Sequence, residues 1–276
     1  MDEFATAPSF AQARGAVAFW DLGEGLPVLV LHGFPDAPIG MTPLVERLVA
    51  AGYRAIVPAL PGYTPSDAVE SYQSAAVASD MIAILDTLEL ERIPVVGHDW
   101  GGCVALDLGA NHADRVSRVV SLAIPHPDGF AARRLDLQEQ KTAAYAWILA
   151  YSSGAAQLAS DPVWLDQVHQ EWSPGLHRSE WPAIKEILQQ PGVGEAVHGW
   201  YRDDFGASTS TGDVLVPTLM LHGGNDGCIR PACFTGFEQR FPAGLELEQV
   251  DGVGHWLHIE RPDAIAARIL HFLTAA

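Results

Sequence analysis

Short, fully apolar segments alternate along this chain with longer segments in which apolar residues recur at helical spacing. Residues 27–31 and 93–96 are continuous apolar runs, the pattern of strands buried on both faces. Between them, residues 71–88 carry apolar side chains three or four positions apart, as an amphipathic helix does. Strands that alternate with helices predict an α/β fold with a mostly parallel, doubly wound sheet.

The alternation stops near Pro125 and resumes at residues 214–221, followed by a predicted helix at 231–241. The intervening segment is rich in tryptophan and helical in parts, and it contains no strand-like run. A helical insertion within one α/β domain explains this break. The predicted division is a core domain of residues 1–125 and 207–276 and a helical cap of residues 126–206.

Composition narrows the classes of protein to consider. The chain has 276 residues, of which 48% are hydrophobic and 18% charged, so it holds enough apolar material for one sizeable core and does not resemble a disordered chain. The formal net charge of −18 repels nucleic acid and anionic membranes, and neither is expected as a partner. No site for a metal ion is predicted.

Three features point to a cytoplasmic protein with reduced thiols. The three cysteines, Cys103, Cys228 and Cys233, are odd in number and lack C-x-x-C spacing, so neither a disulfide framework nor a zinc site is expected of them. The first residues are acidic where a secretory signal is basic. No stretch reaches the ~18–20 apolar residues that span a bilayer.

The strongest chemical signal is residues 97–102, Gly-His-Asp-Trp-Gly-Gly, directly after a predicted strand and before a predicted helix. A nucleophile flanked at two positions by glycine is typical of a sharp strand-to-helix turn, whose strained backbone needs small neighbours. The central residue is Asp99. An aspartate is ionised at neutral pH and needs no base to activate it, and the free N–H groups of the helix stabilise its charge.

Two further residues follow later predicted strands. Asp226 lies in Gly-Gly-Asn-Asp-Gly and His255 in Gly-Val-Gly-His-Trp. Each alone is explained as a turn aspartate or a surface histidine. Together, in the order nucleophile, acid, histidine, they predict a triad whose chain order differs from those of chymotrypsin and subtilisin. The backbone N–H groups of Trp100 and Phe34 are predicted to form an oxyanion hole.

These motifs resemble those of α/β-hydrolase-fold epoxide hydrolases. His-Gly-Phe-Pro at 32–35 matches the family's H-G-x-P signature, residues 97–102 match its elbow, and Trp-Tyr-Arg at 200–202 resembles the segment that carries a ring-opening tyrosine. The resemblance runs from about residue 27 to 262. It implies an α/β-hydrolase fold with a helical cap, no cofactor, and a small apolar or aromatic epoxide as substrate, with water as the second reactant.

The resemblance also implies a two-step mechanism. Asp99 attacks an epoxide carbon to give an alkyl ester, while Tyr201 donates a proton to the ring oxygen. His255, oriented by Asp226, then activates the water that hydrolyses the ester to a vicinal diol. The family usually supplies a second cap tyrosine, whose position here stays open. Neither Tyr145 nor Tyr151 aligns with it, and Trp147 nearly does.

The lining of the substrate pocket is predicted less sharply. The tryptophans of the insertion either line an apolar pocket or form the core of the cap itself. Asp36, where the family often has glutamate, either helps to hold the hydrolytic water or belongs to a plain turn. The residues predicted to line the pocket are Trp147, Tyr145, Tyr151, Trp200 and Asp36.

The sequence leaves two other functions open. Haloalkane and haloacetate dehalogenases share the aspartate nucleophile, and Trp100 stands where the haloalkane enzymes place a halide-binding indole. However, those enzymes typically have asparagine at the position of Phe34, and haloacetate enzymes place arginines at those of Trp100 and Cys103. The second alternative is a binding protein that kept the fold without the activity. The particular substrate and the oligomeric state are not determined by the sequence.

Overall fold

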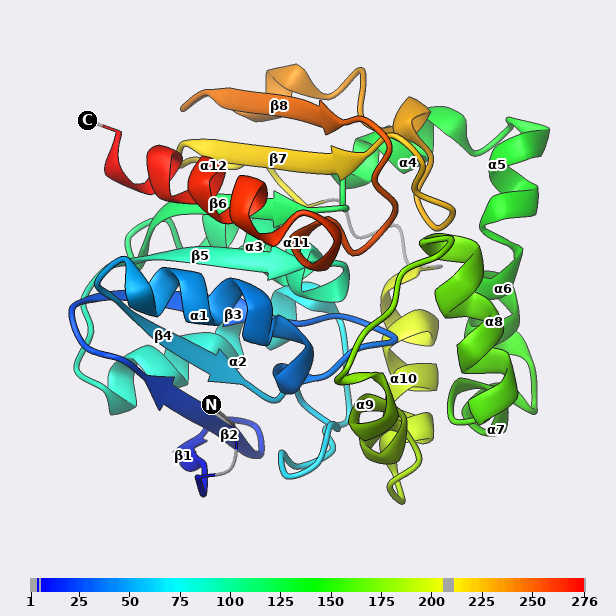
Figure 1. Cartoon of the computed structure of the whole chain (residues 1–276), viewed down its shortest axis with the longest axis horizontal. Coiled ribbons are helices and arrows are strands. Elements are labelled where there is room, and N and C mark those ends of the chain that lie inside the picture. The colour runs from blue at the N-terminus through cyan, green and yellow to red at the C-terminus, as the bar shows by residue number, and fades with distance from the viewer. Residues whose placement is uncertain (1–3, 5, 206–210, 276) are drawn as a thin grey trace.

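The predicted alternation of strands and helices forms a single eight-stranded sheet in the computed structural model, which describes residues 4, 6–205 and 211–275 (Figure 1). The order is β1-β2-β4-β3-β5-β6-β7-β8. The strands are β1 (Ser9–Gln12), β2 (Ala16–Leu22), β3 (Leu26–Leu31), β4 (Tyr53–Pro58), β5 (Ile93–His98), β6 (Val116–Leu122), β7 (Thr218–Gly223) and β8 (Leu245–Val250).

Strands β3 to β8 run parallel, and only β1 with β2 and β2 with β4 are antiparallel. The carboxyl ends of the parallel strands therefore meet at one edge of the sheet, which is where open α/β sheets bind their ligands. The helices between β6 and β7 lie at this edge (Figure 1). The prediction of a mostly parallel α/β sheet is confirmed.

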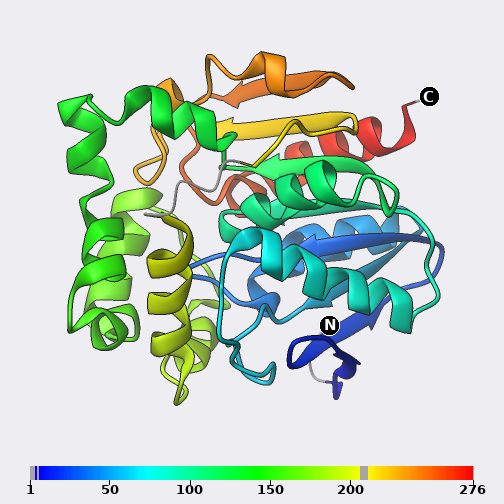
Figure 2. The same cartoon turned by 180° about the vertical axis from the view of Figure 1, so that it is seen from behind.

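The central strand β3 is apolar along its whole length because both faces of the sheet are covered. On β3, Val28 and Val30 belong to one hydrophobic core, and Leu29 and Leu31 belong to the other. One face is covered by α1 (Thr42–Ala50), α11 (Leu257–Glu260) and α12 (Pro262–Thr274), and the other by α2 (Ser74–Thr87) and α3 (Trp100–Asn111) (Figures 1 and 2).

The segment between β6 and β7 is helical. Its helices are α4 (Pro127–Arg133), α5 (Leu137–Thr142), α6 (Ala144–Tyr151), α7 (Ala155–Ala159), α8 (Pro162–Trp172), α9 (Trp181–Leu188) and α10 (Val193–Trp200), and it ends in a π-helical turn, Tyr201–Phe205. Of the five tryptophans in these helices, Trp172, Trp181 and Trp200 are buried. The predicted return to the core at residues 206–207 lies outside the described residues.

The predicted helix at 231–241 is wrong. The chain forms two short 3-10 turns there, Pro231–Cys233 and Glu238–Arg240, and a third one, Pro38–Met41, precedes α1. Between the first two, Gly236 has a φ of +87°, which a right-handed helix cannot contain. The apolar residues Phe234 and Phe237, whose spacing suggested a helix, are buried without one.

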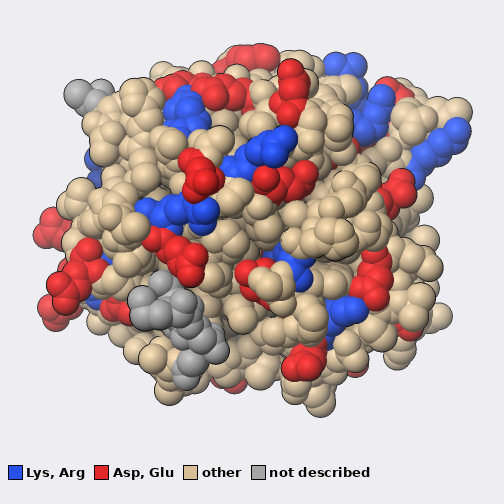
Figure 3. Space-filling view, viewed as in Figure 1, with Lys and Arg blue, Asp and Glu red and all other residues tan. Residues whose placement is uncertain are grey.

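The chain has 34 acidic and 16 basic side chains, not counting histidine. On the face shown in Figure 3, aspartates and glutamates are interspersed with lysines and arginines, over both the sheet and the helical insertion. Within the described part of the chain, no helix is long and apolar enough to cross a membrane.

Candidate active site

Asp99 stands on the sharp turn between β5 and α3. Its φ of 52° and ψ of −123° are strained for a residue with a side chain. The turn is tight enough to require glycine on either side: a Cβ on Gly97 would lie 2.0 Å from the carbonyl oxygen of Gly101, and one on Gly101 would lie 2.5 Å from that of Leu31. The Asp99 carboxylate is thereby held at the start of α3, only 4% exposed.

The loop after β3 supplies a hydrogen-bond donor to this carboxylate. The Phe34 N–H donates to Asp99 Oδ1 at 2.8 Å, and Gly33 allows the approach because a Cβ there would lie 2.4 Å from that of Asp99. His32 braces the loop: its Nε2 accepts from the Leu60 N–H, and its Nδ1 lies 3.0 Å from the Gly33 carbonyl oxygen. Burial lowers the pKa of His32 to about 4, so the imidazole is neutral and holds this tautomer.

His255 lies between two carboxylates. Its Nδ1 is 2.9 Å from Asp226 Oδ2, and its Nε2 is 3.5 Å from Asp99 Oδ2. The other oxygen of Asp226 accepts the backbone N–H groups of Cys228 and Ile229 at 2.7 and 2.9 Å, which fixes that carboxylate after β7. Among the described residues, Nε2 of the fully buried His255 makes no hydrogen bond.

The charges of His255 and Asp99 follow from their environments. Burial by itself would lower the pKa of His255, but the charges of Asp226 and Asp99 and the hydrogen bond to Asp226 outweigh it and raise that pKa to about 10. Burial would likewise raise the pKa of Asp99, but the charge of His255 prevails and lowers it. In the free protein, an ionised Asp99 therefore faces an imidazolium.

Two buried phenols of the helical insertion lie near enough to Asp99 for its charge to act on them. The Tyr201 ring packs edge-on at 5.0 Å from the Trp100 ring, and the Tyr145 ring lies 6.0 Å from that of Tyr201. The Tyr145 hydroxyl is 3.1 Å from Cys228 Sγ. Burial raises the pKa of both phenols well above 10, and the Asp99 charge adds to the rise. Both hydroxyls therefore keep their protons and can donate them.

Comparisons with known proteins identify the family of this chain. Residues 27–262 match the model of the alpha/beta hydrolase fold family. This chain belongs to that family.

The hydrolase is similar to several named epoxide hydrolases. It is 28% identical to epoxide hydrolase A of Mycobacterium tuberculosis, covering 92% of both chains, and 28% identical to epoxide hydrolase 3 of Xenopus tropicalis, covering 89% of this chain and 71% of the relative. Among solved structures, the epoxide hydrolase CorEH superposes with a TM-score of 0.81 at 21% identity over 96% of this chain and 98% of the other. At that identity, the structural likeness supports the fold alone.

A cavity of about 500 Å³ lies between α5, α6 and α8 of the hydrolase. Tyr145, Trp164 and Trp172 belong to its lining. Trp172 also packs edge-on at 5.2 Å from His255, and Trp164 stacks at 6.3 Å on Phe34. The cavity therefore borders the residues around Asp99. Its polar lining residues are Gln138, Lys141, Thr142, Gln167 and Glu171.

Of the predicted pocket residues, Tyr145 alone lines this cavity. Trp147 and Tyr151, predicted for the pocket, are 51% and 60% exposed and stack on each other on the outer side of α6. The sequence could not show this because α6 is apolar on nearly all sides, so its inward face has no distinct pattern. Trp200 is buried, and its ring centroid lies 5.6 Å from that of Trp100. Its indole N–H donates to the Pro61 carbonyl oxygen.

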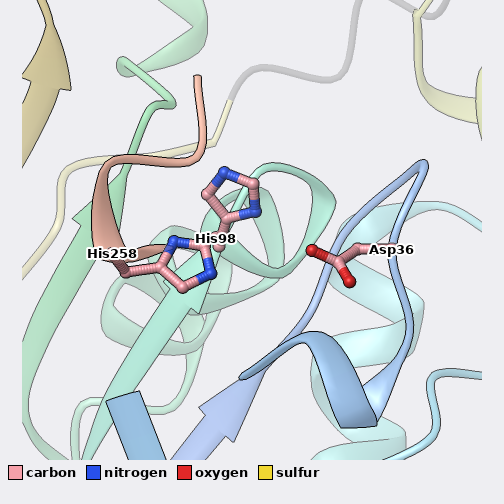
Figure 4. Close-up of side chains that lie close together, drawn as sticks. All are labelled: Asp36, His98 and His258. Carbon is pink, nitrogen blue, oxygen red and sulfur yellow. The ribbon is translucent and has the colours of Figure 1, made fainter. Parts of the chain in front are cut away.

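Asp36, the fifth predicted pocket residue, is fully buried behind the site. Its carboxylate accepts from Arg178 Nη2 at 3.0 and 3.1 Å and from the Trp256 indole at 3.1 Å. The ligand atoms of Asp36, His98 and His258 all lie within 4.8 Å of one another (Figure 4). However, the Arg178 guanidinium already neutralises the carboxylate, which disfavours a cation there.

Four residues of this site had no signal in the sequence that singled them out. Cys228 follows the predicted acid by two positions, but its contact with Tyr145 joins residues 83 positions apart. Trp172 and Trp164 are two tryptophans among the five of the insertion, and Arg178 lies in the connection between α8 and α9. Only the packing of the insertion on the sheet edge brings Trp172 to His255, Trp164 to Phe34, Arg178 to Asp36 and Tyr145 to Cys228.

Proposed function

We propose that this hydrolase adds water to epoxides to give vicinal diols, through a covalent ester on Asp99. The observation that carries the proposal is the environment of one buried carboxylate. Its Oδ1 accepts the Phe34 N–H, its Oδ2 faces His255, and the buried phenols of Tyr201 and Tyr145 lie on the side of the helical insertion. The named relatives support the same activity.

In the first step, Oδ2 of Asp99 forms a bond to an epoxide carbon, and the bond from that carbon to the ring oxygen breaks. Tyr201 passes its proton to the departing oxygen, which becomes the first hydroxyl of the product. The ester carries no charge, so the contribution of Asp99 to the raised pKa of His255 disappears. The imidazolium then returns a proton to the phenolate and becomes a neutral base.

In the second step, His255 takes a proton from water as the water attacks the carboxyl carbon of the ester. The negative charge that develops lies on Oδ1, which already accepts the Phe34 N–H at 2.8 Å, and the N–H of Trp100 in the first turn of α3 is the second donor in this proposal. Collapse releases the second product hydroxyl, which receives its proton from His255. The proton of the regenerated carboxylic acid returns to His255, which restores the ion pair.

Tyr145 is the second proton donor in this proposal. It is buried next to Tyr201 and keeps its proton, whereas Tyr151 points away from the site. Tyr145→Phe and Tyr201→Phe are each expected to slow ester formation about 10- to 100-fold, because general-acid catalysis contributes ~10²–10⁴-fold and the remaining phenol keeps part of it. Single-turnover kinetics measure ester formation and ester hydrolysis separately.

Tyr151→Phe is the matched control for these variants and should leave both rates unchanged. An equal loss in ester formation and hydrolysis would mean that the phenols only support the fold of the insertion. Unchanged ester formation in Tyr145→Phe would remove Tyr145 from the mechanism and leave Tyr201 as the sole donor.

The proposed function is tested with a panel of aryl and alkyl epoxides and matched bromoalkanes, scored for diol and for bromide. Diol without bromide, lost in Asp99→Asn, is the expected result. Bromide release would support a dehalogenase instead. The dehalogenase alternative is weakened because the Trp100 side chain hydrogen-bonds to Tyr201. This bond engages the indole N–H that would hold a halide. No turnover of either class would favour a binding protein.

A further inference from the structure

We propose that Asp99, His255 and Cys228 form a binding site for a thiophilic divalent cation, with Zn²⁺ as the model ion, and that the bound ion blocks the nucleophile. The three residues are buried, and one ligand atom from each lies within 4.8 Å of the other two. Their oxygen, nitrogen and sulfur atoms are the donors that zinc takes in proteins.

The spacing of these donors suits a tetrahedral ion. Zinc bonds of 2.0–2.3 Å place neighbouring donors about 3.3–3.7 Å apart. Asp99 Oδ2 and His255 Nε2 are already separated by 3.5 Å. The thiol therefore needs to approach by about 1 Å at most, which is within the reach of a rotation of the Cys228 side chain. Three protein ligands leave a fourth position open to water.

Asp226 and Tyr145 contact two of the three donors, as neighbouring side chains support zinc ligands in other proteins. Asp226 holds Nδ1 of His255 at 2.9 Å, which directs the unpaired Nε2 at the site, as the carboxylate of a carboxylate–histidine–zinc arrangement does. The Tyr145 hydroxyl, 3.1 Å from Cys228 Sγ, can donate to the thiolate once the thiol has released its proton to solvent. The contact between Asp226 and His255 does not have to be rearranged for the ion to bind.

Charge distinguishes the cluster of Asp99, His255 and Cys228, the catalytic cluster, from a second cluster that lies behind it. Asp36, His98 and His258 are equally close together, but Arg178 places a permanent positive charge on that carboxylate. Around Asp99 the charges are the carboxylates of Asp99 and Asp226 and the imidazolium of His255 between them, and an ion that binds Nε2 displaces its proton to solvent. The displaced proton leaves two carboxylates to balance the charge of the ion, whereas the carboxylate of Asp36 is already balanced by Arg178, so a cation is favoured more at the catalytic cluster than at the one behind it.

Binding is tested by equilibrium dialysis of the untagged protein against zinc chloride, and with Co²⁺ as a spectroscopic probe. We expect one equivalent of Zn²⁺ and a cobalt–thiolate absorption band. Cys228→Ser should weaken Zn²⁺ binding at least tenfold and abolish the band, whereas the matched control Cys103→Ser should keep both. Asp99→Ala, which keeps the thiol, should weaken binding while retaining the band.

Two results would overturn the site: no saturable binding in the wild-type protein, or binding of equal strength in Cys228→Ser. The inhibitory effect rests on the proposed function, and the binding does not. With an epoxide as substrate, Zn²⁺ should inhibit diol formation competitively, a chelator should restore it, and Cys228→Ser should need at least tenfold more Zn²⁺. One bound equivalent of Zn²⁺ without epoxide turnover would support the metal site and reject the proposed function. Epoxide turnover without Zn²⁺ binding would support the proposed function and reject the metal site.

Discussion

The His255→Gln variant, mixed with an epoxide that the wild type turns over, is expected to gain the mass of one substrate molecule and to release almost no diol. Ester formation needs Asp99 and the phenols, which this change leaves in place. Ester hydrolysis needs a base for water, and loss of a general base slows such a step by ~10²–10⁴. The ester therefore accumulates, and intact-protein mass spectrometry detects it.

Glutamine is chosen because its amide N–H can still donate to Asp226, so this buried carboxylate keeps a partner in addition to the Cys228 and Ile229 N–H groups. Peptide mapping should place the added mass on Asp99. The matched control is His271→Gln on the exposed side of α12, which should show wild-type turnover and no adduct. Full turnover by His255→Gln would contradict the assigned base, and an adduct on another residue would contradict the assigned nucleophile.

The Arg178→Met variant is expected to lose about 3–5 kcal/mol of unfolding free energy, because it leaves a buried carboxylate without its counter-charge. The side chains of Arg178 and Asp36 are both fully buried. The guanidinium also lies over the rings of Trp256 and Trp181, at 5.5 and 5.8 Å. Chemical denaturation followed by tryptophan fluorescence measures the loss.

A double-mutant cycle separates the ion pair from the packing. In an Asp36→Asn background, Arg178→Met should cost clearly less than it does alone, because no unpaired carboxylate is left behind. The exposed pair of Arg54 and Asp21 is the control: Arg54→Met should cost under about 1 kcal/mol. Equal costs of Arg178→Met in both backgrounds would mean that the arginine acts through its ring contacts and not through its charge.

The same ion pair ties the helical insertion to the catalytic loops. Arg178 comes from the connection between α8 and α9, whereas Asp36 follows Phe34, the proposed oxyanion donor, by two positions. In the preceding turn of the insertion, the Trp172 carbonyl oxygen accepts the backbone N–H of His255 at 3.0 Å. The segment from Trp172 to Arg178 therefore contacts both the loop of the proposed oxyanion donor and the loop of the proposed base.

The sequence by itself determined what depends on short-range pattern. Apolar runs such as residues 27–31 mark strands that are covered on both faces, and their alternation with helices predicts the parallel sheet. The glycines beside Asp99 mark a turn that only small residues permit, so the position of the elbow is visible in the sequence. The same local reasoning failed at residues 231–241, where Gly236 breaks a pattern of apolar spacing that suggested a helix.

Only the tertiary structure decided which side chains of the insertion face the Asp99 carboxylate. Helix α6 is apolar nearly all round, so the sequence does not show that Tyr145 turns inward while Trp147 and Tyr151 turn to solvent. Likewise, no local pattern pairs Asp36 with Arg178, which is 142 positions away, or brings Cys228 to Tyr145. Local backbone sterics and burial patterns act over a few residues and can be read along the chain. Contacts between distant segments depend on how the insertion packs against the sheet edge, and that packing has no local signature.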